Sequence, residues 1–202
     1  MSNTKQAKKA PGKDSVIIYI VLAFVAGFVS GAAFAVYKTV PSDTSPAVTG
    51  QSQIAEEQAQ HIAHLEEDVA ADPDNFQAWA QLGNLYFDTS QYEKAVNAYK
   101  RSLEFQPDNP DVWTDLGVMY RRNKQPDKAI EAFNQAIEVD PSHEISRINK
   151  GIVLLYDLND PQGAITSWEN LLKINPGAKT GSGNSIREFV DQLKQDLEKQ
   201  EQ

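Results

Sequence analysis

Three histidines are the side chains best suited to metal binding or acid–base chemistry in this sequence. His61 and His64 lie three positions apart, a spacing that puts both imidazoles on one face of a helix. No third ligand accompanies them, so we interpret them as solvated helix residues rather than a metal or haem site. His143 follows Pro141 in an expected turn and has no evident partner. The histidines therefore predict neither a metal site nor a catalytic base.

Other arrangements that support catalysis are incomplete in the sequence. Gly181–Asn184 precedes an expected helix, but no strand precedes it and no lysine follows it, so it is interpreted as a flexible linker rather than a phosphate-binding loop. There is no serine nucleophile elbow, no His-Glu-x-x-His motif and no cysteine. We therefore expect a non-enzymatic protein with no catalytic residue, metal, cofactor or small-molecule substrate.

The distribution of charge separates the N-terminus from the rest of the chain. The net charge is −9 overall, although residues 1–14 contain four lysines. Residues 39–202 are therefore strongly acidic and would repel phosphate backbones, so we expect no nucleic-acid partner.

Residues 15–37 carry no charge and are predicted to form a transmembrane helix. As a helix, the apolar run from Val16 to Val36 within this segment spans ~31 Å, which matches the hydrocarbon thickness of a bilayer. The lysines of residues 1–14 place the N-terminus in the cytoplasm by the positive-inside rule, and the acidic body is then exported. An alternative is signal-peptide cleavage after Ala35, because Ala33-Phe34-Ala35 resembles a signal peptidase site.

Small residues within this segment suggest a second role for it. Gly27 and Gly31 form a G-x-x-x-G pattern that Ala35 extends by one turn, so a lateral transmembrane-helix partner is a further hypothesis. Residues 38–52 are rich in Pro, Ser and Thr and are predicted to be a flexible tether.

The remainder of the chain contains an internal repeat. Pro73, Pro107, Pro141 and Pro176 are separated by 34, 34 and 35 residues. Other residues recur at the same period: Trp79, Leu82, Gly83, Tyr86, Ala95 and Tyr99 return as Trp113, Leu116, Gly117, Tyr120, Ala129 and Phe133. This pattern resembles the tetratricopeptide-repeat (TPR) family, which implies an all-α solenoid of about three helix-turn-helix repeats that binds proteins.

The third unit departs from the pattern. Arg147 and Lys150 replace the Trp and Leu, and Ala164, Trp168 and Pro176 are displaced by one position, which predicts an inserted residue near Asn159. Apolar stripes before and after the repeats predict flanking helices. The expected organisation is residues 1–14, basic N-terminus; 15–37, transmembrane helix; 38–52, tether; 53–72, preceding helix; 73–107, 108–141 and 142–178, repeats; 179–202, linker and C-terminal capping helix.

In a solenoid of this kind, one side of each first helix lines a concave groove. The repeat register assigns these groove residues: Asn84, Phe87, Asp88, Val118, Arg121, Arg122, Ile148, Ile152, Leu155 and Tyr156. The clamp by which some TPR domains hold a peptide carboxylate matches only at Asn84. Arg121 and Arg122 are expected to pair with acidic groups of a peptide and the later residues to hold its apolar groups. An alternative interpretation is a solvated helix end for the arginines and repeat core for the isoleucines.

The combination of membrane helix, tether and repeats resembles the TPR accessory subunits of bacterial c-type cytochrome maturation. The stretch Gly163–Glu169, with Leu171 and Leu172, is similar to the last repeat of that group. The resemblance implies a protein of the bacterial inner membrane with periplasmic repeats that present an extended peptide to membrane-bound machinery. Three alternatives stay open: a translocon-associated chaperone-like protein, a structural assembly factor and a eukaryotic organelle-surface import receptor.

Overall fold

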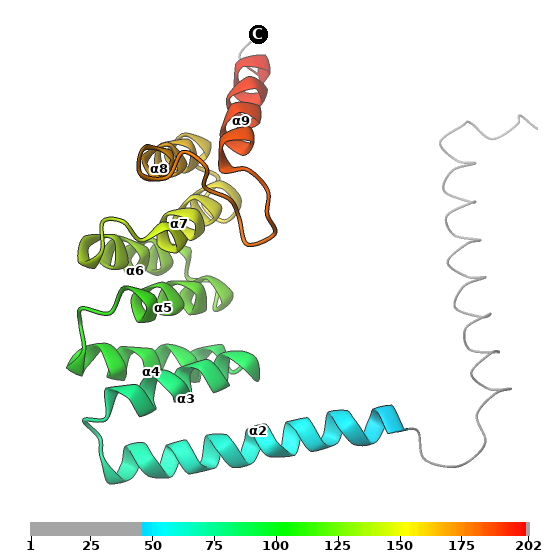
Figure 1. The fold of residues 1–202 in the computed structure, drawn as a ribbon, viewed down its shortest axis with the longest axis vertical. Helices are drawn as coiled ribbons and strands as arrows, with labels where there is room; N and C mark the ends of the chain where they lie inside the picture. Colours follow the sequence, from blue (N-terminus) through cyan, green and yellow to red (C-terminus); the bar gives the residue numbers. More distant parts are fainter. Residues whose placement is uncertain (1–45, 201–202) are drawn as a thin grey trace, which may run out of the picture. The chain divides into compact units, whose positions relative to one another are not determined.

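The fold was analysed in a computed structural model, which describes residues 46–200. The chain divides into two units, residues 1–52 and 53–202. The described elements are all helical (Figure 1): α2 (Pro46–Ala71), α3 (Phe76–Asp88), α4 (Tyr92–Phe105), α5 (Pro110–Arg122), α6 (Pro126–Val139), α7 (Glu144–Tyr156), α8 (Pro161–Ile174) and α9 (Ile186–Gln200). The predicted all-α class is confirmed for this part of the chain.

Helices α3 to α8 form three hairpins, which stack in sequence order (Figure 1). Helix α3 packs on α4, α5 on α6 and α7 on α8, while α4 contacts α5 and α6 contacts α7. Each first helix begins after the turn that follows a repeated proline. The side chains of Asn75 and Asn109 cap α3 and α5 by accepting hydrogen bonds from backbone N–H groups of the first turn.

The turn between the two helices of each hairpin shows where the third repeat gains a residue. Ser90, Lys124 and Asn159 each adopt a left-handed backbone conformation, with φ of 60°, 56° and 52°. The first two are 34 positions apart and the last two 35. The predicted insertion near Asn159 therefore lies in the turn between α7 and α8, where it leaves the helices in register.

The repeated glycines lie where the two helices of a hairpin cross. A Cβ atom on Gly83 would lie 2.7 Å from the ring of Tyr99, and one on Gly117 would lie 2.5 Å from the ring of Phe133. In the third hairpin the corresponding contact joins Gly151 to Trp168, at 2.2 Å. The absence of a side chain thus lets the buried aromatic of the second helix reach the backbone of the first.

Helix α2 occupies the position of a second repeat helix. Its residues Ile62, Leu65 and Val69 are buried in one cluster with side chains of α3, α4 and α5. It begins at Pro46, so the predicted tether is wrong for residues 46–52, which are helical. The tether was predicted from the richness of this segment in Pro, Ser and Thr. A Pro at the first helical position is nevertheless compatible with the start of a helix.

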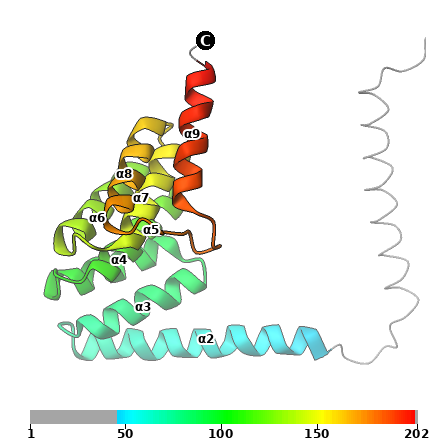
Figure 2. The ribbon, with the colours of Figure 1, turned by 45° about the horizontal axis from the view of Figure 1, so that its top comes forward.

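The C-terminal helix packs on the last hairpin, as predicted (Figures 1 and 2). Ile186 and Val190 are buried with Trp168 and Leu171, and Phe189 meets the Trp168 ring edge-on at a centroid distance of 5.5 Å. Among residues 46–200, no helix has both the length and the apolar character needed to cross a bilayer. The predicted membrane helix at 15–37, with Gly27, Gly31 and Ala35, lies outside the described residues.

Candidate functional site

The residues predicted to line the concave groove lie on α3, α5 and α7, and we refer to this set as the inner face. Asn84, Phe87 and Asp88 are exposed on α3, Arg122 on α5 and Tyr156 on α7. The other members, Val118, Arg121, Ile148, Ile152 and Leu155, are half-buried. The exposure of the inner face therefore differs between repeats: its members on α3 are all exposed, whereas most of those on α5 and α7 are partly buried by contacts within the protein.

At the α3 end, the inner face carries the amide of Asn84 and the carboxylate of Asp88 beside the exposed ring of Phe87. The Tyr99 hydroxyl donates a hydrogen bond to Oδ1 of Asn84 at 2.5 Å. Burial and the nearby carboxylates of Asp115 and Asp88 raise the pKa of Tyr99 above its ordinary value. Phe87 packs against Tyr92 with ring centroids 6.5 Å apart. Asn84 is therefore already engaged by a neighbouring helix.

The two arginines of α5 differ in their surroundings. Nε of Arg121 lies 2.5 Å from Oδ2 of Asp157, the residue that follows α7, and so ties the second repeat to the third. No ion pair forms at Arg122 within residues 46–200, and its side chain is exposed. Of the predicted pair, only Arg122 lacks an ion-pair partner among the described residues, so its guanidinium is the one that can meet an acidic group of a ligand.

The apolar end of the inner face is completed by the C-terminal helix. Ile148, Ile152 and Leu155 pack against the cluster that α8 and α9 form. Tyr156 is 63% exposed. A cleft of about 360 Å³ lies between α7 and α9, lined by Leu155, Tyr156, Phe189, Gln192, Leu193 and Asp196. The α9 wall of this cleft was missed, because the sequence identified α9 only as a cap.

A polar network joins α5 to the start of α7. Nδ1 of His143 lies 2.6 Å from the Ser146 hydroxyl, which lies 2.6 Å from the Thr114 hydroxyl, and Nε2 lies 3.0 Å from Oδ1 of Asp111. The expectation that His143 has no partner is therefore wrong, since its partners come from residues distant in sequence. Beside it, burial and the charge of Asp111 raise the pKa of Asp115 to about 6.

The other candidate chemical sites do not assemble. His61 and His64 are exposed on α2, and no group of three potential metal ligands occurs within the described residues. Gly181–Asn184 form a tight turn, in which Thr180 N–H donates to the carbonyl of Asn184 and Gly183 has φ of 86°. The predicted flexible linker is therefore an ordered turn leading into α9.

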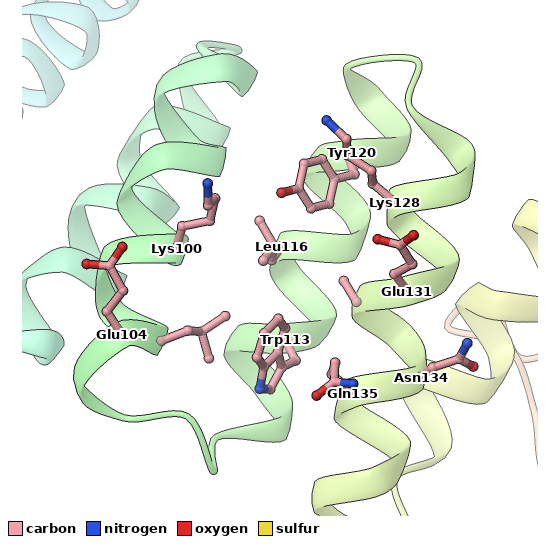
Figure 3. Close-up of a pocket in the computed structure, with 11 residues that line it drawn as sticks. Lys100, Glu104, Trp113, Leu116, Tyr120, Lys128, Glu131, Asn134 and Gln135 are labelled. Atoms are coloured by element: carbon pink, nitrogen blue, oxygen red, sulfur yellow. The ribbon is translucent and has the colours of Figure 1, made fainter.

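A second concavity lies on the opposite side of α5 and was not predicted. We call it the Trp113 groove: it has a volume of about 590 Å³ and lies between α4 and α6, with α5 as its floor (Figure 3). Trp113, Leu116 and Tyr120 line it. The inner-face residues Val118 and Arg122 follow Leu116 and Tyr120 by two positions, which is about 200° around the helix.

The Trp113 groove has counterparts one repeat before and one repeat after it. The Trp79 groove is lined by Trp79, Leu82 and Tyr86 between α2 and α4, with a volume of about 420 Å³. The third groove is lined by Arg147, Lys150 and Leu154 between α6 and α8. These recurring grooves confirm that α2 takes the place of a second repeat helix.

Comparison with known proteins identifies the repeats. Residues 83–124 match a family model for the TPR repeat, and residues 110–143 match one for the tetratricopeptide repeat. No curated protein matches the chain in sequence. The helices of the described residues thus form a TPR solenoid, as the recurring Trp, Gly and Ala positions predicted.

Solved structures share this fold at low sequence identity. A crystal structure of MamA is 22% identical, with a TM-score of 0.58, over 75% of this chain and 93% of that one. The first TPR of Spaghetti (RPAP3), bound to the HSP90 peptide SRMEEVD, is 21% identical, with a TM-score of 0.54, over 62% and 95%. The Sgt2 TPR domain from Aspergillus fumigatus is 23% identical, with a TM-score of 0.53, over 62% and 81%.

Proposed function

We propose that the chain is a non-catalytic scaffold that binds an extended segment of a partner protein across its inner face. The observation that carries this proposal is Tyr156, an aromatic side chain that is 63% exposed at the mouth of the cleft between α7 and α9. An exposed aromatic beside an apolar cleft is typical of a protein-binding anchor. The bound HSP90 peptide in the Spaghetti structure supports peptide binding by this fold.

The setting of this scaffold is the second part of the proposal. Residues 15–37 anchor the chain in the bacterial inner membrane, and the repeats act in the periplasm as an accessory factor in c-type cytochrome maturation. The support is the uncharged segment behind a lysine-rich N-terminus and the resemblance of Gly163–Glu169 to that group. In this setting, the peptide is a segment of an apocytochrome.

Site-specific photocrosslinking tests both parts. A photoreactive amino acid replaces Tyr156 in the full chain, and a matched control variant carries it at Glu138, an exposed residue of α6 outside the inner face. We expect a crosslinked partner at position 156 that is absent at position 138. Identification of the partner by mass spectrometry as a haem lyase component or an apocytochrome supports the maturation role.

Other outcomes separate the alternatives. A translocon subunit at position 156 favours the chaperone-like role, and a second copy of the chain favours an assembly factor. Equal labelling at both positions contradicts the assignment of the inner face as the binding surface.

A further inference from the structure

We propose that the Trp113 groove binds an acidic, apolar segment of a partner protein, with a ligand carboxylate held between Lys100, Lys128 and the hydroxyl of Tyr120. This interaction surface lies on the side of α5 opposite the inner face, so the inference goes beyond the function proposed above.

In the Trp79 groove, a carboxylate of the protein itself, that of Glu66, is bound by a tyrosine and a lysine. The Tyr86 hydroxyl donates a hydrogen bond to Oε1 of Glu66 at 2.5 Å. Nζ of Lys94 lies 3.8 Å from the same oxygen and 5.0 Å from the centroid of the Tyr86 ring. Glu66 belongs to α2, so in this groove the protein itself supplies the anion.

The Trp113 groove has the same donors but a lysine where the carboxylate would be. Counting one repeat of 34 residues onward, Tyr120 is equivalent to Tyr86 and Lys128 to Lys94. The position equivalent to Glu66 is occupied by Lys100. Nζ of Lys128 lies 5.6 Å from the centroid of the Tyr120 ring. Within residues 46–200, neither lysine forms an ion pair and the Tyr120 hydroxyl has no hydrogen-bond partner. An external carboxylate would satisfy all three donors.

Charge along the groove orients the ligand. Figure 3 shows Lys100 and Lys128 near the Tyr120 end, whereas Glu104 lies toward the Trp113 end. Glu131 is the remaining acid of the lining. The pKa of Tyr120 is raised above its ordinary value, mainly by the burial of Tyr120 itself and to a lesser extent by the negative charge of Glu131. The ligand carboxylate is therefore expected at the Tyr120 end, and uncharged or basic groups at the Trp113 end.

The centre of the groove is apolar. Leu103, Leu116 and Ala132 are buried beneath it, and the Trp113 ring is half-buried beside them. The Trp113 indole N–H already donates to the carbonyl of Pro107 at 2.7 Å, so the ring offers a ligand only apolar surface. A volume of about 590 Å³ accommodates apolar side chains next to the carboxylate.

A binding assay with matched peptides tests the proposal. The probe is a fluorescein-labelled peptide of repeating Leu-Glu-Glu-Leu units, and its control replaces every Glu by Gln. We expect the full-length chain to bind the acidic peptide about tenfold more tightly than the control, measured by fluorescence anisotropy. The paired Lys100→Gln and Lys128→Gln variant should lose this preference, whereas Lys173→Gln, an exposed lysine of α8, should retain it.

Three outcomes would overturn the proposal. The first is equal or absent binding of the two peptides to the unmodified chain, and the second is an unchanged preference in the paired lysine variant with unaltered circular dichroism. The third is loss of binding in Tyr156→Ala, because the peptide would then occupy the inner face. That third result would leave the proposed inner-face function standing.

Discussion

At the scale of single residues, one hydrogen bond to the carbonyl of the repeated proline is present in all three repeats, although the residue that donates it changes. The indole N–H groups of Trp79 and Trp113 donate to the carbonyls of Pro73 and Pro107 at 2.8 and 2.7 Å. In the third repeat, the Arg147 guanidinium donates to the carbonyl of Pro141 at 2.6 Å. Arg147 thus departs from the sequence pattern but preserves the hydrogen bond that holds the first helix to the preceding turn.

The glycine at each helix crossing is predicted to resist substitution. Gly151→Ala would place Cβ 2.2 Å from the Trp168 indole, which is buried and cannot move aside. We expect the variant to lose about 2 kcal/mol of unfolding free energy in urea denaturation, despite the better helix propensity of Ala. Gly181→Ala is the control, because a Cβ atom added at Gly181 would meet nothing within 4 Å, and it should change the stability little. An equal loss of unfolding free energy in the two variants would contradict the close contact between Gly151 and Trp168 at the helix crossing.

The raised pKa of Asp115 predicts a pH-dependent stability. Its pKa is about 6 in the folded protein, above the unfolded value of about 4, so the folded state binds the proton more tightly. Ionisation therefore costs stability as the pH rises from about 4 through 6. Asp115→Asn should remove this cost and stabilise the protein by about 1–2 kcal/mol at pH 7, with no comparable gain at pH 4. Urea unfolding at the two pH values checks this, and a gain independent of pH would contradict it.

At the scale of the helix, the flanking helices α2 and α9 cover the apolar surfaces that the first and last hairpins would otherwise expose. Helix α2 replaces a missing second helix and covers α3, while α9 covers the last hairpin. Helix α9 also provides Phe189 and Leu193 to the cleft beside Tyr156. One apolar face thus serves both to close the solenoid and to extend the inner face.

The packing of α9 gives a prediction for this element. Ile186 is 1% exposed, so Ile186→Ala should cost about 2–4 kcal/mol of unfolding free energy by thermal or urea denaturation. Arg187→Ala, at the neighbouring exposed position, should be nearly neutral. If both variants behave alike, α9 does not pack as described.

At the scale of the molecule, residues 53–200 contain separate buried clusters rather than one continuous core. One cluster joins α2 to the second hairpin, and another joins the third hairpin to α9. A small cluster of Ala129, Phe133 and Val153 lies between them. Stability in such a stack depends on the contacts between neighbouring repeats.

Weakening the small cluster should uncouple the C-terminal hairpin. Val153 is fully buried, and Val153→Ala should remove contacts with Phe133. We expect hydrogen–deuterium exchange to accelerate in α7, α8 and α9 while α3 and α4 retain their protection. Uniform acceleration across all the repeats would instead indicate a single cooperative unit.

The sequence by itself determined the repeat, its three hairpins and the inserted residue. A period of 34 residues specifies which side chains face one another, because the same local geometry recurs in each unit. It also placed the inner-face residues on α3, α5 and α7. The period did not predict which side chains pair across repeats: Arg121 of the inner face meets Asp157, and His143, outside the inner face, meets Asp111.

Only the tertiary structure decided which side chains are available to a ligand. Stacking brings α4 beside α6 around α5, creating the Trp113 groove, and folds α9 against α7 to complete the cleft at Tyr156. The physical reason is that periodicity fixes the face on which a residue lies, whereas availability depends on the side chains contributed by neighbouring helices. Lys100 stands where Glu66 stands one repeat earlier, and only packing shows that this exchange leaves two lysines beside a tyrosine hydroxyl that has no hydrogen-bond partner within residues 46–200.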